Sequence, residues 1–182
     1  MRTFLFRSAL AALAGTLCVA FAPAEAAEPS AGGAAAAAPD MAPRIGHSGL
    51  PVPRFVALKK DEVYGRFGPG QDYPVAAVYR RAELPVRVIA ETRDDVWRRI
   101  EDADGQKVWI HRSMLKANDH ALILGEAAVL RAEPEEGARG RAKLAGGVVT
   151  ELLACEAEWC RVKAGDYKGW LPKDALWGAP QS

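Results

Sequence analysis

The residues best able to carry covalent chemistry in this 182-residue chain are its three cysteines. Cys18 lies in an apolar N-terminal segment, whereas Cys155 and Cys160 bracket Glu156 to Trp159 far along the chain. This spacing lets two cysteines face each other across a hairpin, and in an exported protein we expect them to form a disulfide. The alternative, a redox-active dithiol, usually has closer spacing and a cationic neighbour.

Other catalytic and metal-binding arrangements find little support in the sequence. A zinc site would have to combine both thiols with two of His47, His111 and His120, which are distant in sequence. Neither a His-Glu-x-x-His motif nor a Gly-x-Ser-x-Gly elbow occurs. Gly68-Pro69-Gly70 resembles a phosphate loop, but Pro69 lacks an amide donor and no Lys follows, so we interpret it as a turn. We expect no catalytic residue, no metal and no cofactor.

The N-terminus has the pattern of a secretory signal peptide over residues 1–26. Arg2 and Arg7 precede a short apolar core, and Ala24-Glu25-Ala26 supplies small residues for cleavage before Ala27. The apolar core is shorter than a membrane-spanning helix requires. Leu17 stands where a lipoprotein acceptor would need a small residue before Cys18. The sequence therefore predicts a periplasmic or secreted protein that is not inserted in the membrane after cleavage.

Composition changes twice beyond this leader. Residues 27–50 are mostly Ala, Gly, Pro and Ser without hydrophobic periodicity, which predicts a flexible linker. After residue 50, short β-rich runs alternate with Gly, Pro and Asp. The 24 basic and 23 acidic residues of the whole chain are almost balanced. This balance argues against a nucleic-acid partner.

Three sequence blocks occur twice, in the same order. They are Val63–Pro69 with Ala128–Pro134, Trp97–Ile100 with Trp159–Val162, and Trp109–Leu115 with Trp170–Leu176. The repetition predicts two copies of one module, over residues 51–117 and 118–178. Alternating apolar residues from Leu84 to Glu91 predict a half-buried strand, and Asp104-Gly105 and Gly165-Asp166 predict tight hairpin turns. We therefore expect an all-β protein with about five short strands in each copy, each copy ending in a tight turn near 111–115 or 172–176.

These blocks resemble the bacterial SH3 domain, especially its tandem form in small secreted proteins of Gram-negative bacteria. The segments that carry the resemblance are Arg66–Val75, Trp97–Ile100 and Trp109–Leu115. The resemblance is weaker in copy two, since Arg131–Pro134 lacks the glycines. Copy one departs at Val108, where the family usually has Gly; copy two keeps this residue as Gly169. The resemblance implies two tandem five-stranded SH3-like barrels, each closed by a 3₁₀ turn. It also implies binding to cell-wall peptidoglycan or an envelope protein.

The tryptophans are the first candidates for ligand binding. Alternation places Trp97 opposite Ile100 and Trp159 opposite Val162, which puts both indoles on the outer or groove side if Ile100 and Val162 are core. An exposed indole suits recognition of peptides or sugars. The alternative is that each ring packs beneath a loop or caps the barrel. We expect Trp109 and Trp170, which precede the tight turns, to be core residues.

Copy one also contains further aromatic residues near its first repeated block. Tyr64, Phe67, Tyr73 and Tyr79 could extend an aromatic groove there, with Arg66 as a candidate carboxylate partner. Copy two has only Leu130 and Ala132 opposite the first two, so copy one is the expected owner of a groove. The sequence thus predicts a monomeric, non-enzymatic exported protein that binds peptidoglycan or its stem peptides. A protein-interaction adaptor or regulator of the envelope is the alternative.

Overall fold

The computed structural model describes residues 43–180, which lie within one compact unit. These residues form β-strands and two 3₁₀ turns, with no α-helix among them. No helix in this range is long and apolar enough to cross a membrane. The predicted signal peptide, its cleavage site and residues 27–42 of the predicted linker lie outside the described residues.

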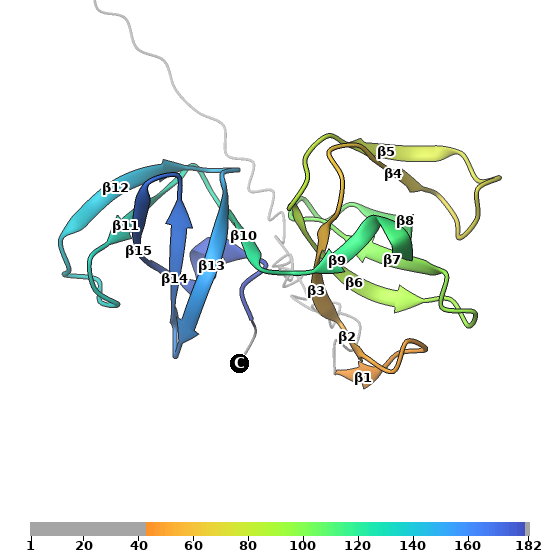
Figure 1. The fold of residues 1–182 in the computed structure, drawn as a ribbon, viewed down its shortest axis with the longest axis horizontal. Helices are drawn as coiled ribbons and strands as arrows, with labels where there is room; N and C mark the ends of the chain where they lie inside the picture. The colour runs from red at the N-terminus through yellow and green to blue at the C-terminus, as the bar shows by residue number, and fades with distance from the viewer. Residues whose placement is uncertain (1–42, 181–182) are drawn as a thin grey trace, which may run out of the picture. The chain divides into compact units, whose positions relative to one another are not determined.

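The first module is a seven-stranded sheet with the strand order β5-β4-β8-β7-β6-β3-β9 (Figure 1). Its strands are β3 (Arg54–Leu58), β4 (Val63–Arg66), β5 (Val75–Tyr79), β6 (Pro85–Glu91), β7 (Trp97–Glu101), β8 (Lys107–His111) and β9 (Leu115–Ala117). A 3₁₀ turn, η1 (Arg112–Met114), connects β8 to β9. All neighbouring strands are antiparallel.

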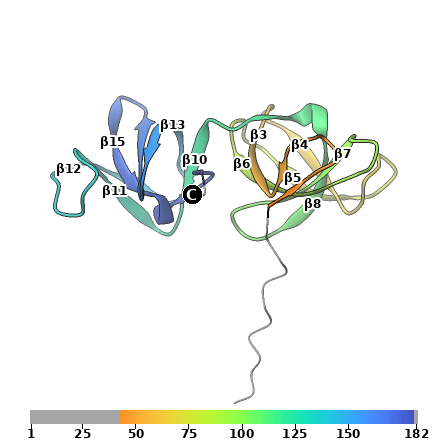
Figure 2. The ribbon, with the colours of Figure 1, turned by 90° about the horizontal axis from the view of Figure 1, so that it is seen from below.

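The second module repeats this sheet, with the order β12-β11-β15-β14-β13-β10-β16. Figure 2 shows the ribbon from below, with β10, β11, β12, β13 and β15 labelled. Its strands are β10 (His120–Ile123), β11 (Ala127–Arg131), β12 (Gly140–Ala145), β13 (Val149–Glu156), β14 (Trp159–Ala164), β15 (Tyr167–Pro172) and β16 (Leu176–Trp177), with η2 (Lys173–Ala175) before β16. The all-β fold, the two modules and both tight turns are confirmed. Each sheet has seven strands rather than five, because short segments such as Leu115–Ala117 pair with a neighbour although they are too short to show alternation.

The registers of the two sheets match residue by residue. In the first, Arg66 and Arg99 flank Trp109 across neighbouring strands. In the second, Arg131 and Arg161 flank Trp170 in the same way. Register shifts also recur at equivalent places, between Gly65 and Arg66 as between Leu130 and Arg131, and between Val88 and Ala90 as between Leu152 and Ala154. Bulges at such positions increase strand bending and twist, which lets each sheet curve around its core.

Each module has its own hydrophobic core. In the first, Val108 and Ile110 of β8 pack with Val86, Val88 and Ile100. Trp109 lies between Val108 and Ile110, so its side chain points to the opposite face and is partly exposed. Trp170 lies likewise beside Leu171, outside the second core. The expectation that Trp109 and Trp170 are core residues is therefore wrong, because strand alternation turns both rings outward.

The departure from the family pattern at Val108 has a local structural reason. Gly65 on β4 faces it, and a Cβ at Gly65 would lie 2.5 Å from Val108 Cγ2. In the second module the large and small residues are exchanged: Leu130 is fully buried on β11, and a Cβ at Gly169 would lie 2.8 Å from Leu130 Cγ. The two modules thus fill the same space from opposite strands, as close packing requires.

The segment before the first module contributes more than the predicted linker, which ended at residue 50. Strand β1 (Arg44–Ile45) pairs with β2 (Pro51–Val52). The hairpin is attached to β6, since Arg44 Nη2 donates to the Ile89 carbonyl at 3.3 Å. Ser48 donates to the Glu91 carboxylate from its backbone N at 2.8 Å and its Oγ at 2.7 Å. Residues 44–50 therefore belong structurally to the first module.

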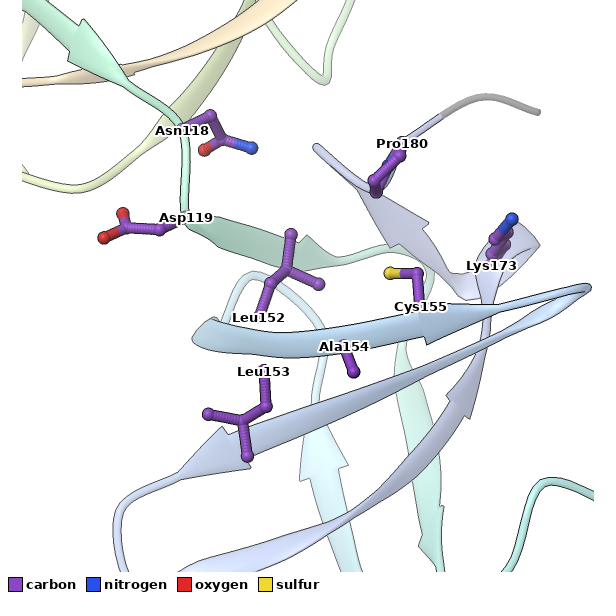
Figure 3. Close-up of a pocket in the computed structure, with 8 residues that line it drawn as sticks. All are labelled: Asn118, Asp119, Leu152, Leu153, Ala154, Cys155, Lys173 and Pro180. Atoms are coloured by element: carbon purple, nitrogen blue, oxygen red, sulfur yellow. The ribbon is translucent and has the colours of Figure 1, made fainter.

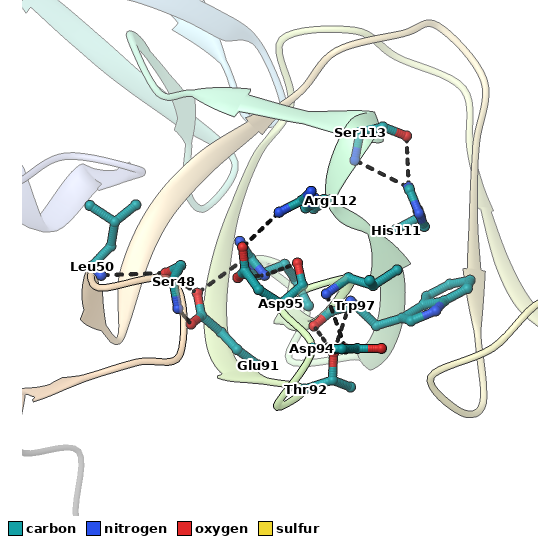
Figure 4. A network of polar contacts seen from close by, with 12 residues as sticks. Ser48, Leu50, Glu91, Thr92, Asp94, Asp95, Trp97, His111, Arg112 and Ser113 are labelled. Atoms are coloured by element: carbon teal, nitrogen blue, oxygen red, sulfur yellow. Dashed lines mark hydrogen bonds and ion pairs between the residues drawn. The ribbon is translucent and has the colours of Figure 1, made fainter.

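The Glu91 carboxylate is the centre of a polar network (Figure 4). Its side chain is 1% exposed and pairs with Arg54 Nη2 at 2.7 Å and Arg98 Nε at 3.2 Å. Arg98 also contacts Asp95 at 2.6 Å, and Asp95 contacts Arg112 at 2.8 Å. Burial alone would raise the pKa of Glu91, but the hydrogen bonds from Ser48 and Arg54 outweigh it, so its pKa is lowered.

Copy two has a disulfide at the cross-strand position that this ion pair occupies in copy one. Glu91 lies opposite Arg98 on β6 and β7, one residue beyond the Ala90–Arg99 pair. Cys155 lies opposite Cys160 on β13 and β14, one residue beyond the Ala154–Arg161 pair. The predicted bond between Cys155 and Cys160 is confirmed, and Cys160 is fully buried.

The fifth tryptophan joins the modules. Trp177 of β16 donates from Nε1 to the Pro85 carbonyl at 3.1 Å. Its ring packs edge-to-face on Phe55 at 5.1 Å and lies 5.0 Å below the Arg87 guanidinium. Trp177 belongs to no repeated block, so the sequence pattern predicts no role for it.

Glu91→Gln tests the polar network. We expect a loss of about 3 kcal/mol in the free energy of unfolding at neutral pH, because the buried Arg98 and the partly buried Arg54 lose their shared anion. Since the folded pKa of Glu91 is lowered, its contribution is present above the unfolded pKa and disappears as the pH falls through the folded pKa. Urea unfolding between about pH 7 and pH 3 should therefore show a weaker acid dependence in the variant. Glu151→Gln, which removes an exposed pair with Lys163, is the control; equal losses in both variants would contradict the account.

Reduction of the disulfide tests its role in the second module. Since the bond closes a short loop, we expect reduction to lower the free energy of unfolding by about 2 kcal/mol. Urea unfolding with and without a thiol reductant measures the change, and mass spectrometry verifies the free thiols. The double variant Cys155→Ala/Cys160→Ala should not respond to the reductant. Unchanged stability in the fully reduced protein would refute this prediction.

Candidate ligand-binding surface

The β4–β5 hairpin exposes three aromatic side chains. Tyr64 is 48% exposed, Phe67 71% and Tyr73 48%, with Val75 and Val78 exposed beside them on β5. We call Tyr64, Phe67 and Tyr73 together the aromatic hairpin surface. Apolar rings with this degree of exposure cost solvation free energy in the isolated protein, so these three side chains are candidates for contact with a ligand or partner.

The loop that carries Phe67 and Tyr73 has a defined shape. Arg66 Nη1 donates to the Tyr73 carbonyl at 2.7 Å, which ties the two ends of the loop together. The Tyr73 ring lies over Gly68, where a Cβ would come within 2.3 Å of Cδ1. Arg131 makes the equivalent bond to the Ala138 carbonyl at 3.1 Å in copy two. The Arg66 guanidinium therefore holds the loop. Its contact with a ligand carboxylate stays a prediction.

Two tyrosines of this hairpin have opposite environments. Tyr64 donates from its hydroxyl to Glu62 Oε1 at 2.5 Å, and this hydrogen bond raises its pKa. Glu62 in turn pairs with Arg80 at 3.0 Å. Tyr79 is buried and donates to Asp102 Oδ2 at 3.0 Å, and burial raises its pKa strongly. Tyr79 is thus a core residue and not part of a groove.

Trp97 lies on the face predicted for it but is not exposed. It is absent from the core cluster that contains Ile100, as alternation requires, yet only 8% of its surface is accessible. The His111 ring packs edge-to-face against it at 5.4 Å, and His111 also caps η1 by accepting from Ser113 N (Figure 4). The expected exposure of Trp97 is wrong, because its register partner on β8 covers the ring.

Copy two does not reproduce the aromatic hairpin surface. Leu130 is fully buried and Ala132 is partly buried. Trp159, opposite Pro172, is also partly buried. The exposed large apolar residues described in this copy lie on three different strands: Val129, Leu153 and Tyr167. The asymmetry predicted between the copies is therefore present in the exposed side chains.

Copy two instead has a shallow hollow beside β13 (Figure 3). Leu152, Leu153, Ala154 and Cys155 line one side, and Asn118, Asp119, Lys173 and Pro180 line the rest. The Cys155 sulfur is bonded to Cys160, so it cannot act as a nucleophile. The Asp119 carboxylate is held by His120 Nδ1 at 2.6 Å, and this bond lowers the pKa of Asp119. Both of these side chains are therefore engaged by protein partners.

One group of side chains could offer ligands to a metal. Glu83, Asp119 and His120 bring oxygen and nitrogen atoms within 4.8 Å of one another. Lys116 Nζ, however, lies 2.5 Å from Glu83 Oε2. The ammonium already supplies the positive charge that a metal ion would bring, so we interpret this group as an ion-pair cluster.

The chain belongs to the bacterial SH3 domain family. The family model matches it twice, over residues 59–116 and 125–178, which together make up more than half of the chain. Each segment covers most of one sheet, whereas β3 and β10 precede the matched residues. No curated protein shows significant similarity to the chain.

Among solved structures, three matches have low overall similarity. NlpC2 from Trichomonas vaginalis has 12% identity, a TM-score of 0.32 and coverage of 69% of this chain and 48% of its own. NlpC1 from the same organism has 12% identity, a TM-score of 0.31 and coverage of 68% and 45%. An NlpC/P60 family protein from Bacillus cereus has 13% identity, a TM-score of 0.32 and coverage of 68% and 55%. This chain thus spans about half the length of these proteins.

Trp97→Ala tests the assignment of Trp97 to packing. We expect a loss of about 3 kcal/mol in the free energy of unfolding, because truncation removes a buried ring. Phe67→Ala, which truncates an exposed ring, should change stability by no more than about 0.5 kcal/mol. Thermal and urea unfolding compare the two variants. A Trp97 variant as stable as the Phe67 variant would return Trp97 to the candidate surface.

Proposed function

We propose that this protein is an exported, non-enzymatic binding protein whose first SH3 module recognises peptidoglycan or its stem peptides. The observation that carries the proposal is the aromatic hairpin surface, which one module presents and the other lacks. The surface comprises Tyr64, Phe67 and Tyr73, whereas Arg66 acts by positioning the loop.

The chemistry of this surface favours a ligand with both apolar and polar groups. A Phe or Tyr ring offers a flat face to a sugar or a peptide, and a tyrosine adds a hydroxyl at its edge. Tyr64 and Tyr73 are half-exposed. The Tyr64 hydroxyl is bonded to Glu62 and the Tyr73 ring lies over Gly68, so both side chains are held while part of each surface remains open to a ligand. A surface that is already shaped before binding loses less conformational entropy when the ligand binds.

The compartment is part of the proposal. A signal-like leader supports export, and the Cys155–Cys160 disulfide supports an oxidising compartment such as the periplasm or the exterior. The same disulfide supports a non-enzymatic role, because it engages the only two cysteines beyond the leader. Recognition of cell-wall material is a frequent role of bacterial SH3 domains and gives the ligand class.

A protein-interaction adaptor of the envelope is the second candidate. The observation that favours it is the edge of β5, which has no second partner strand among residues 43–180 and where Val75 and Val78 are 42% and 40% exposed. Unpaired strand edges bind other polypeptides by backbone hydrogen bonding. A stable complex in a crosslinked envelope extract, together with no retention on cell wall, would favour this role.

Co-sedimentation with purified peptidoglycan sacculi tests the first candidate. We expect the wild-type protein to sediment with sacculi and Phe67→Ala to bind about tenfold more weakly, because Phe67 is the most exposed ring of the surface. Tyr167→Ala is the matched control, since Tyr167 is an exposed aromatic residue of the second module. Circular dichroism verifies that both variants are folded.

Two results would contradict the proposal. If the wild-type protein stays in the supernatant, peptidoglycan is not the ligand. If Phe67→Ala and Tyr167→Ala weaken retention equally, the aromatic hairpin surface is not the binding site.

A further inference from the structure

Strand β5 ends its sheet without the usual protection of an edge strand. It pairs with β4 on one side and has no strand on the other within residues 43–180. Its sequence, Val75-Ala76-Ala77-Val78-Tyr79, contains no charged residue and no proline. Natural edge strands commonly carry charges, above all lysine, because an apolar edge pairs with other chains.

The equivalent edge of the second module carries that protection. Strand β12 ends its sheet in the same place, and its sequence is Gly140-Arg141-Ala142-Lys143-Leu144-Ala145. Val78 lies opposite Tyr64 and Lys143 opposite Val129, so Val78 and Lys143 are register equivalents. The strand irregularity near Arg66 recurs near Arg131 and therefore does not distinguish the two edges. Of these two equivalent edge strands, only β5 of the first module is uncharged.

The β5 sequence is complementary to itself. Val75-Ala76-Ala77-Val78 reads the same in both directions, so antiparallel pairing of two copies sets Val75 of each copy opposite Val78 of the other. Such a pair has two-fold symmetry, which makes the contact isologous and closed. The same pairing of two β12 edges would crowd four cations, Arg141 and Lys143 from each copy, onto one short ladder.

We propose that β5 is a self-association edge and that its partner is a second copy of this chain. Two copies join antiparallel through β5, and the two sheets become continuous. The exposed valines become buried, and the aromatic hairpin surfaces of the two copies come to lie on one assembly. The contact is small, so the dimer is weak and forms as the protein concentration rises. This inference replaces the monomer expected from the sequence and does not depend on the proposed ligand.

Dimerisation would also change how a polymer is bound. Two aromatic hairpin surfaces on one dimer engage a polymeric ligand at two points, and the second contact forms at a high effective concentration. Binding to an insoluble wall would then be tighter than binding to a single soluble fragment.

Sedimentation velocity of the purified protein over a wide concentration range, without any ligand, tests the proposal. We expect the weight-average sedimentation coefficient to rise with concentration toward that of a dimer. Val78→Lys copies the protection of β12 into β5, and it should raise the dimer dissociation constant by at least about tenfold, because a charge then lies at the apolar contact.

Val129→Lys is the matched control. Val129 is as exposed as Val78, but β11 is an interior strand, so this variant should associate like the wild-type protein. A sedimentation coefficient that does not change with concentration would overturn the proposal, as would a dimer that persists in Val78→Lys or is lost equally in both variants. Because no peptidoglycan is present, these outcomes are independent of the co-sedimentation result.

Discussion

The buried carboxylate of Glu91 is the interaction on which the first module depends. Glu91 lies on β6 and contacts Ser48 of the N-terminal hairpin, Arg54 of β3 and Arg98 of β7. Four chain segments, β6 included, therefore meet at this carboxylate. A charge with 1% exposure is stable only with such partners. At the equivalent position the second module uses the Cys155–Cys160 disulfide. One fold therefore has two solutions for the same cross-strand link, an ion-pair network that recruits residues 44–50 and a covalent bond that suits an oxidising compartment.

The cross-strand link holds each sheet together away from the β4–β5 hairpin and its equivalent, β11–β12. These two hairpins can therefore differ in sequence. Both hairpins keep the arginine that ties the loop ends together. Only the first adds exposed rings and an uncharged edge, while the second places Arg141 and Lys143 at its edge. The fold is thus maintained by residues that the modules share or exchange in equivalent places, such as Gly65 with Leu130 and Val108 with Gly169. Recognition, in our account, depends on the residues that they do not share.

The sequence predicted features that are local or repeated. It was less informative about contacts between distant residues and about which side chains shield a given residue from solvent. The duplication and the two turns follow from the repeated blocks, and the disulfide follows from the cysteine spacing together with the predicted export. Alternation assigned Trp97 to the correct face, but it does not tell what lies above that face, and His111 from another strand covers the ring. The position of Trp109 before the tight turn suggested a core role. The alternation of Val108, Trp109 and Ile110 instead predicts that Trp109 points outward, as it does. The contact between Ser48 and Glu91 joins residues with no shared pattern, so an Ala- and Gly-rich context suggested a linker where a docked hairpin exists.

An NMR titration of the isotope-labelled protein with soluble peptidoglycan fragments tests the central claim, that one of two similar modules carries the recognition surface. The account predicts chemical-shift changes in Tyr64, Phe67, Tyr73 and their neighbours on β4 and β5, with the signals of β11 and β12 unchanged. Changes centred on the second module, or equal changes in both hairpins, would contradict it.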